Sequence, residues 1–423
     1  MKKKYSIFLA AWTLAASLLL GQAGAKGSLV IIGVAQESAD RIFQRFIELG
    51  GGVEKIRLAI IPAGSPEPAV RGREYTADFT RLGVPAERIR VFPVAVVDDP
   101  STKDVDESKW INNGSNEEMA RDMLDYTAVY FSGGDQIRYN QTLKKANGED
   151  TPLLRSIRKV YADGGVIGGS SAGAAMMCDP MICEGYSMKA LNSGAAYKPD
   201  SCPEAKGVSL SNGLGFFSHG LVDQHFLKRG RVGRLIMALY ALPKVWLGVG
   251  IDEDTAAIYH AGTIEVLGSS GVLVIDVTAA KAAGNFTWST DGGFKAKGII
   301  LHYLEEGDRY DIATKTPLPL PERKPIIEGK KEYSEYPLAT DLFGRDIFKG
   351  MLVDGMAENQ KAETSGIAFT LDNEGRGTGS QWTLRKTDRF AGLYASIKDK
   401  DTYTVTYVSL EIQPLTIKVK KIR

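Results

Sequence analysis

The segment Gly169-Ser170-Ser171-Ala172-Gly173 carries the residue types of a catalytic nucleophile. It fits the pattern G-x-S-x-G, in which a serine stands exposed on a tight turn between a strand and a helix. The glycines are needed because side chains beside such a turn would clash. The amide after the serine lies at a helix N-terminus, where it can stabilise an oxyanion. A close helix–sheet contact gives the same letters, but the flanking strand and helix patterns favour Ser171 as the nucleophile.

A serine nucleophile needs a base, usually histidine, which a carboxylate holds in place. The chain has four histidines: His219, His225, His260 and His302. His225 is surrounded by a dense set of polar and cationic residues: Asp223, Gln224, Arg229, Arg231 and Arg234. Arginines suit bidentate recognition of carboxylates, although a solvated basic helix start has the same composition. We therefore interpret His225 as the base and expect His260 and His302 to be structural.

Three acids, Asp252, Glu253 and Asp254, follow an apolar run and are the candidates that orient the histidine. Their spacing does not choose among them. With His225 the chain order is Ser, His, acid. The α/β-hydrolase order would instead combine Asp252 or Glu253 with His302. The polar residues around His225 favour the first order.

A second loop, Ser132-Gly133-Gly134-Asp135-Gln136, ends another apolar run. Adjacent glycines let the backbone approach a ligand and present amide donors. An ordinary glycine turn after a strand gives the same pattern, so this loop supports a site only together with the serine segment.

Short apolar runs and helical patterns alternate from Leu29 to about Asp276 and must position these residues. The apolar runs lie at 29–35, 57–64, 128–134, 166–169 and 246–252. The helical patterns begin at Asp40, Ser115, Pro152 and Val232, and Ser115 with Glu118 resembles a capping box. This alternation predicts an α/β fold, a mostly parallel sheet with helices on both faces. Ligands of such folds bind at the carboxyl ends of strands, where the segments described above lie.

The pattern changes from Ala257 onward to alternating residues separated by glycine turns. It predicts a β-meander and, at 298–312, one more strand that completes the core. Residues 314–325 are Pro-rich and indicate a linker. We expect an α/β domain over residues 26–313 and a small β-rich C-terminal extension of unknown role over 326–423.

The N-terminus has the pattern of a cleavable signal peptide. Lys2, Lys3 and Lys4 precede an apolar stretch from about Ile7 to Leu20, and small residues end it at Ala25. The stretch is shorter than the about 20 residues that a membrane span requires. We expect residues 1–25 to be removed and the mature protein to be soluble, secreted or periplasmic, and free of the membrane.

Charge and cysteine content narrow the partners. With 52 Lys and Arg against 51 Asp and Glu, the net charge of +1 gives no reason to expect nucleic acid or an anionic membrane as a partner. The three cysteines predict one disulfide, most naturally Cys183 with Cys202, and a buried thiol at Cys178. The histidines and cysteines show no metal-ligand spacing, so neither a metal nor an organic cofactor is implied. The sequence leaves the oligomeric state open, a homodimer included.

Four segments, taken in order, resemble the cyanophycinases and the related aspartyl dipeptidases. They are FSGGDQ, GGSSAGAA, VDQHFLKRGRVGRL and GIDEDTA, and the likeness covers roughly residues 28–313. The resemblance implies a class I glutamine-amidotransferase-like fold with a Ser-His-Glu triad at Ser171, His225 and Glu253, although Asp252 leaves the register of the acid open. It implies an oxyanion hole formed by the amides of Gly134 and Ala172. The substrate-contacting residues that it implies are Gln136, Asp223, Gln224, Arg229, Arg231 and Arg234.

The same resemblance implies the substrate and the products. Cyanophycinases are serine exopeptidases that hydrolyse cyanophycin, a poly-aspartate backbone with arginine on each side chain, to β-aspartyl-arginine dipeptides. The signal peptide, the segment 178–210 after the nucleophile and the region beyond about Pro325 depart from the compact members of the family. The alternatives are a peptidase for short aspartyl or isoaspartyl peptides, an esterase that uses His302, and a non-catalytic secreted binding protein.

Overall fold

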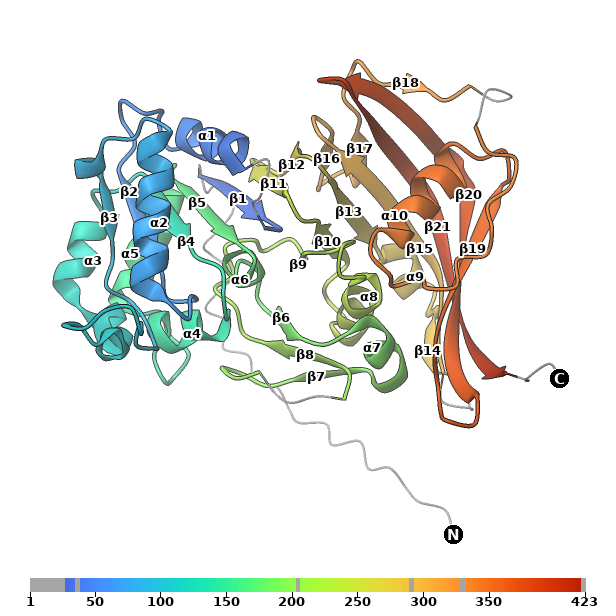
Figure 1. The fold of residues 1–423 in the computed structure, drawn as a ribbon, viewed down its shortest axis with the longest axis horizontal. Coiled ribbons are helices and arrows are strands. Elements are labelled where there is room, and N and C mark those ends of the chain that lie inside the picture. The colour runs from blue at the N-terminus through green and yellow to red at the C-terminus, as the bar shows by residue number, and fades with distance from the viewer. Residues whose placement is uncertain (1–26, 35–38, 203–205, 289–292, 328–331, 420–423) are drawn as a thin grey trace, which may run out of the picture.

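The computed structural model describes residues 27–34, 39–202, 206–288, 293–327 and 332–419. The expected signal peptide, residues 1–25, lies outside these residues. Within them the strands form two nine-stranded sheets and one three-stranded sheet, arranged side by side in Figure 1. No helix in the described part of the chain is both long and apolar enough to cross a membrane.

The first sheet has the order β17-β16-β12-β11-β1-β5-β4-β2-β3. Its strands are β1 (Ser28–Ile32), β2 (Leu58–Ile61), β3 (Ile89–Val91), β4 (Ala128–Phe131), β5 (Val166–Ser170), β11 (Thr255–His260), β12 (Thr263–Gly268), β16 (Arg309–Asp311) and β17 (Thr316–Leu318). The five strands from β1 to β3 in this order are parallel, and the remaining strands pair antiparallel. The carboxyl ends of β1, β5 and β4 therefore meet at one edge of the sheet.

Helices cover both faces of this parallel part. The α-helices are α1 (Ala39–Leu49), α2 (Pro68–Arg81), α3 (Glu117–Met123), α4 (Ile137–Leu143), α5 (Pro152–Ala162), α6 (Ala172–Ala175), α7 (Ser187–Ser193), α8 (Val232–Ala241), α9 (Thr278–Ala282) and α10 (Ile347–Leu352). In β1, Val30 packs in one core cluster with Phe46 of α1, and Leu29 packs in the other with Leu154 of α5. Successive side chains of a strand point to opposite faces, so a strand buried on both faces is apolar throughout. The predicted α/β class is confirmed.

The helical pattern at 115 begins one residue later than its capping signal suggested. Ser115 ends a 3-10 helix, η2 (Glu107–Ser115), and α3 begins at Glu117. The cap is Asn116, whose side chain accepts hydrogen bonds from the amides of Glu118 and Met119. Asn is as good an N-cap as Ser, so the expected Ser115 capping box was wrong.

The second sheet joins the middle of the chain to its C-terminal region. Its strands are β9 (Leu221–Gln224), β10 (Leu247–Ile251), β13 (Gly271–Asp276), β14 (Phe286–Trp288), β15 (Phe294–Glu305), β18 (Lys324–Pro325), β19 (Glu363–Leu371), β20 (Arg376–Ile397) and β21 (Lys400–Lys418). Only β9 and β10 pair in parallel, and the other pairs are antiparallel. The run at 246–252 thus lies in this second sheet and not in the sheet that contains the other predicted apolar runs. The expected meander likewise divides, with β11 and β12 in the first sheet and β13 in the second.

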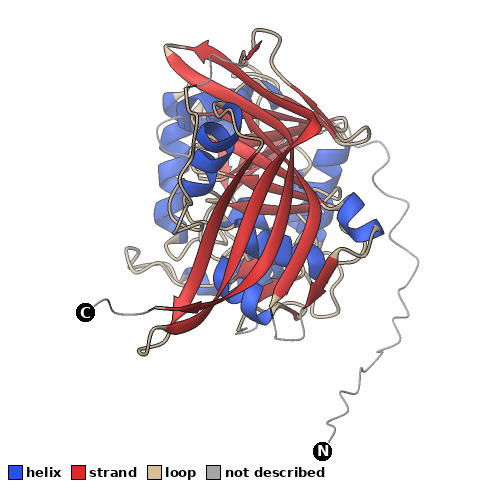
Figure 2. Cartoon of the chain, turned by 90° about the vertical axis from the view of Figure 1, so that its right-hand side faces the viewer, coloured by secondary structure: helices blue, strands red, loops and turns tan. Residues whose placement is uncertain are grey.

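The C-terminal strands continue this second sheet. Strand β15 pairs with β13 on one side and β21 on the other, and Figure 2 shows the long strands running along one side of the molecule. The Pro-rich residues 314–325 contribute β17 to the first sheet and β18 to the second. The region beyond residue 325 therefore shares its hydrogen bonds and its core with the rest of the chain.

The segment after Ser171 forms the third sheet. Its strands are β6 (Met181–Glu184), β7 (Ala195–Tyr197) and β8 (Val208–Ser211). Cys183 and Cys202 form a disulfide with a Cα–Cα distance of 5.9 Å, and Cys178 is a buried free thiol. Both cysteine predictions are confirmed.

Candidate active site

Ser171 stands on the turn that leaves β5, the strand between β1 and β4. Its backbone has φ 55° and ψ −106°, a conformation that costs energy for a residue with a Cβ. The glycines on either side leave no room for side chains. A Cβ on Gly169 would lie 2.4 Å from the Gly173 carbonyl oxygen, and a Cβ on Gly173 would lie 2.5 Å from that of Phe131. The pattern G-x-S-x-G therefore has a steric cause in this chain.

His225 reaches Ser171 from the second sheet. It follows β9, and its Nε2 lies 2.9 Å from the Ser171 Oγ. Its Nδ1 lies 2.7 Å from Oε1 of Glu253, which follows β10. Strands β9 and β10 are parallel, with Gln224 opposite Ile251, so the residues after them emerge at the same edge. The register of the sheet thus places His225 beside Glu253.

Asp252 turns away from the histidine. It is fully buried, and its Oδ1 accepts hydrogen bonds from the amides of Leu227 and Lys228, both at 3.0 Å. Its Oδ2 accepts one from the Ser270 hydroxyl at 2.8 Å. The choice between Asp252 and Glu253, which the sequence left open, falls on Glu253 as the acid in contact with His225.

The other two histidines that the sequence set aside lie in strands. His260 in β11 is 3.1 Å from the Ser28 hydroxyl, through its Nδ1. His302 in β15 is buried and accepts a hydrogen bond from the Tyr407 amide at 3.2 Å. The arrangement that would combine Ser171 with His302 is therefore not the one in the structure.

The glycine loop after β4 lies against Ser171. A Cβ on Gly133 would lie 3.5 Å from the Ser171 Cβ. Gly134 has φ 131°, and a Cβ on it would lie 1.9 Å from the Gly64 carbonyl oxygen, so only glycine fits. Ala172 is the first residue of α6, and its amide has no intrahelical acceptor. Among the described residues neither the Gly134 nor the Ala172 amide donates to a protein group.

The predicted substrate-contacting residues lie around His225, but most of them form hydrogen bonds or ion pairs with other groups of the protein. Arg234 makes a bidentate ion pair with buried Asp223, with Nε–Oδ2 at 2.7 Å and Nη2–Oδ1 at 2.5 Å. Arg231 donates to the backbone and side-chain oxygens of Gln224 at 2.7 and 2.6 Å. Gln136 donates to the Cys183 carbonyl at 2.8 Å. These contacts hold the buried residues around His225 in place, and the Gln136 contact reaches strand β6 of the third sheet.

Arg229 differs from Arg231 and Arg234 in its exposure. Its side chain is 53% exposed, and its Nε lies 3.7 Å from Glu253 Oε1. It is therefore a cation beside the Ser171–His225–Glu253 group that a ligand can reach.

Burial sets the protonation of the histidine. The pKa of His225 is lowered to about 4, chiefly by desolvation and then by the charges of Arg229 and Arg231, although the hydrogen bond that His225 donates to Glu253 raises it. The imidazole is thus neutral near pH 7 and free to accept a proton from Ser171. Burial raises the pKa of Asp252 and lowers the pKa of Arg231 to about 10.

Comparisons with known proteins identify the family. Residues 110–267 match peptidase family S51. The chain is 33% identical over 295 residues to a cyanophycinase of Synechococcus elongatus, covering 69% of this chain and 81% of that protein. It is 33% identical over 297 residues to a cyanophycinase of Geminocystis herdmanii, covering 69% of this chain and 96% of that protein. The chain belongs to the cyanophycinase family, peptidase family S51. It is a serine-type peptidase.

A solved structure, that of a peptidase from an acI-B1 Actinobacterium, aligns over 59% of this chain and 92% of its own, with 21% identity and a TM-score of 0.43.

In the described residues of our chain, no three His, Cys, Asp or Glu side chains are grouped so as to hold a metal ion.

Some contacts near the site had no sequence signal. Lys228, three residues after His225, pairs with Asp346 of the C-terminal region at 2.5 Å. The two residues are 118 positions apart, so no local pattern connects them. The role of Asp252 in binding the Leu227 and Lys228 amides was hidden for the same reason.

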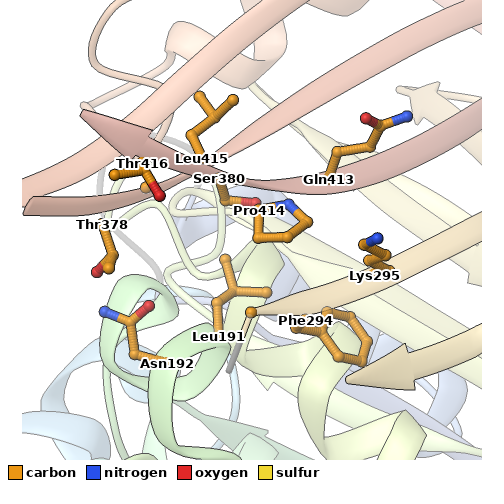
Figure 3. A pocket seen from close by; sticks show the side chains of 12 residues that line it. Leu191, Asn192, Phe294, Lys295, Thr378, Ser380, Gln413, Pro414, Leu415 and Thr416 are labelled. Atoms are coloured by element: carbon orange, nitrogen blue, oxygen red, sulfur yellow. The ribbon is translucent and has the colours of Figure 1, made fainter. Parts of the chain in front are cut away.

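A separate cavity of about 400 Å³ lies where α7 meets β15, β20 and β21 (Figure 3). Its polar side chains are mostly hydroxyls and amides, with Lys295 at one side. It contains none of the site residues described above.

Proposed function

We propose that the protein is an exported cyanophycinase that uses Ser171, His225 and Glu253 as a catalytic triad. The observation that carries the proposal is the pair of short contacts, 2.9 Å from Ser171 to His225 and 2.7 Å from His225 to Glu253, in a chain of the cyanophycinase family. A nucleophile, a base and an orienting acid in hydrogen-bond contact are what acyl transfer by a serine peptidase needs.

The reaction proceeds through an acyl-enzyme. Ser171 Oγ attacks the backbone carbonyl carbon of an aspartyl residue while His225 Nε2 accepts the hydroxyl proton. Glu253 stabilises the resulting imidazolium, and the amides of Gly134 and Ala172 bind the oxyanion. His225 then donates its proton to the leaving amine. Water, deprotonated by His225, hydrolyses the ester and restores the serine.

The substrate assignment rests on the relatives and on the charge of the site. Cyanophycin offers carboxylates and guanidinium groups together. Arg229 is the exposed cation next to the triad and suits a carboxylate of the polymer. Arg231 and Arg234 instead form ion pairs with buried Asp223. Cleavage of the poly-aspartate backbone at successive residues gives β-aspartyl-arginine dipeptides.

Export is supported by the signal-peptide pattern of residues 1–25. The Cys183–Cys202 disulfide fits an oxidising compartment. An enzyme outside the cytoplasm would degrade polymer released by other cells.

The test is to incubate the mature chain, residues 26–423, with insoluble cyanophycin and to identify soluble products by mass spectrometry. We expect β-aspartyl-arginine from the wild type and none from Ser171→Ala. Absence of product from folded wild type, with cleavage of short isoaspartyl peptides instead, would reject the polymer as substrate. Export is tested separately by expressing the full chain in a Gram-negative host and sequencing the N-terminus of the periplasmic product, which we expect to begin at Lys26.

A further inference from the structure

The turn from His225 to Arg231 is held from two sides. On the side of the α/β core, Asp252 accepts hydrogen bonds from the Leu227 and Lys228 amides. On the other side, Asp346 of the C-terminal region donates its amide to the Leu227 carbonyl at 3.3 Å. The Asp346 Oδ2 lies 2.5 Å from the Lys228 Nζ. The two acids thus bind the same two residues of the turn.

A third contact closes the turn near its end. Gly230 has φ 56°, and a Cβ on it would lie 2.0 Å from the Phe343 carbonyl oxygen. The C-terminal backbone is therefore packed against the turn without space for any larger residue.

The segment that makes these contacts is fixed to the C-terminal strands. The rings of Phe343 and Phe348 lie edge-on to buried Trp382 of β20, with centroids at 5.3 and 5.7 Å. The Leu342 amide donates to the Ile367 carbonyl of β19 at 3.1 Å. Figure 1 shows α10, which begins directly after Asp346, in front of these strands.

We infer that residues 341–349 are a positioning element for the catalytic histidine, with Asp346 as the positioning residue that holds the His225 turn against Ser171. The inference rests on the proposed triad and gives the C-terminal region a role in the same reaction. Asp346 touches neither Ser171 nor His225, and it acts through Leu227 and Lys228.

The backbone of His225 explains why such support is needed. His225 has φ 50°, in the left-handed region that a residue with a Cβ seldom adopts. A strained conformation persists only where its surroundings determine it. If the C-terminal contacts are lost, the turn can relax, the imidazole moves away from Ser171 and water reaches it.

Two variants remove the contact in different ways. Asp346→Ala removes the carboxylate, and Lys228→Met removes its cation while the Asp346 amide contact to Leu227 remains. Lys228→Arg is the conservative variant and should restore the ion pair. Glu363→Gln is the matched control, because it breaks an exposed ion pair with Arg385 on β19 and β20.

The first readout is the rate at which a fluorophosphonate modifies Ser171, measured from pH 3 to 9 on the full mature chain. The groups that face His225 are Ser171, Glu253, Arg229 and Arg231, and none of them is altered. We expect the rate to fall at least tenfold in Asp346→Ala and Lys228→Met, with recovery in Lys228→Arg. The acid limb should move upward from about pH 4, because a hydrated imidazole regains its pKa.

The second readout is the ¹⁵N NMR titration of His225, which needs no substrate. A raised His225 pKa in Asp346→Ala, with a thermal midpoint within a few degrees of wild type, supports the inference. Modification rates within twofold of wild type and an unchanged His225 pKa in both variants would overturn it. Failure of wild type to cleave cyanophycin rejects the proposed substrate only, since both readouts are independent of the polymer.

Discussion

The two carboxylates at the end of β10 show how neighbouring residues of one type take different roles. Glu253 meets His225 Nδ1, whereas Asp252 points to the opposite side and binds the Leu227 and Lys228 amides. Adjacent residues leaving a strand point in opposite directions, so only one of the pair can face the histidine. Replacing Glu253 and replacing Asp252 should therefore have different effects on activity and on stability.

Glu253→Gln should lower kcat/KM by about 1,000- to 10,000-fold, because a neutral amide no longer stabilises the imidazolium and can favour the wrong tautomer. Its thermal midpoint should stay near that of wild type. Asp252→Asn should instead lower the thermal midpoint by several degrees, since a neutral amide oxygen accepts weaker hydrogen bonds from the Leu227 and Lys228 amides than a carboxylate does. Steady-state kinetics with thermal unfolding of both variants makes the comparison. The reverse ranking of the two kinetic effects would assign the orienting role to Asp252.

The depressed pKa of His225 predicts the pH profile. The pKa of about 4 lies below the ordinary value of 6.5, so the base is neutral throughout pH 5 to 8. kcat/KM should stay constant in that range and fall as the pH drops through about 4, because the protonated imidazole accepts no proton. The stability contributed by the neutral, buried form is fully present above pH 6.5 and is lost as the pH falls toward 4. An acid limb near pH 6.5 in the kcat/KM profile would contradict this assignment.

Two arginines after His225 are predicted to have different roles, Arg234 in the stability of the fold and Arg229 in the recognition of the substrate. Arg234→Met removes the bidentate partner of buried Asp223 and leaves Arg231, at 3.7 Å, as its remaining cation, so it should cost about 3 kcal/mol of unfolding free energy. Arg229→Met removes an exposed cation, so the unfolding free energy should change by less than about 0.5 kcal/mol while KM rises. Urea unfolding and initial rates on cyanophycin distinguish the two. If both variants lose equal stability, Arg229 is structural as well.

At the scale of the elements, a substitution in the glycine loop after β4 tests whether this loop forms part of the oxyanion hole. Gly134→Ala would place a Cβ 1.9 Å from the Gly64 carbonyl oxygen and push the loop away from Ser171. We expect kcat to fall about 100- to 1,000-fold, the usual effect of losing an oxyanion donor. Gly148→Ala is the matched control, because Gly148 also has a positive φ, 81°, and has open space around it. Equal activities of the two variants would exclude the loop from the oxyanion site.

The sequence predicted those elements that are determined locally. The strands before Ser171 and Gly133, the helix starting at Pro152 and the disulfide all follow from patterns of a few residues. Pairing between distant segments has no such signal. The division of the strands into two sheets depends on long-range register, and β10 pairs with β9 and β13 in the second sheet.

The same distinction holds for the site. Ser171 and His225 were identified by their neighbours along the chain, and the family resemblance selected Glu253. The ion pair of Asp223 with Arg234 could not be predicted from spacing. A basic, polar segment has the same composition whether its side chains face solvent or pair with one another beneath a site. Lys228 and Asp346 meet only because β15 joins the C-terminal strands to the core.

For the molecule as a whole, the C-terminal region is part of the core. Strand β15 carries buried Leu301 and Tyr303 between β13 and β21, and their partners in both neighbouring strands are buried as well: Ile275, Leu273, Val408 and Val405. Figure 3 shows Leu191 and Phe294 on one side of the cavity and Pro414 and Leu415 of β21 on the other. Removing β19 to β21 would expose the apolar edge of β15, and exposed strand edges of this kind promote aggregation.

A chain that ends at residue 325 should therefore be insoluble or aggregate, although it retains all of the segments that resemble the cyanophycinases. In the full mature chain, one cooperative thermal transition is expected, with loss of Ser171 reactivity and loss of the far-UV circular dichroism signal at the same temperature. Coincident transitions are what a shared core predicts, whereas an appended domain unfolds separately. A soluble, active 26–325 fragment, or two separated transitions, would show that the C-terminal sheet is dispensable and would also contradict its role in holding the His225 turn.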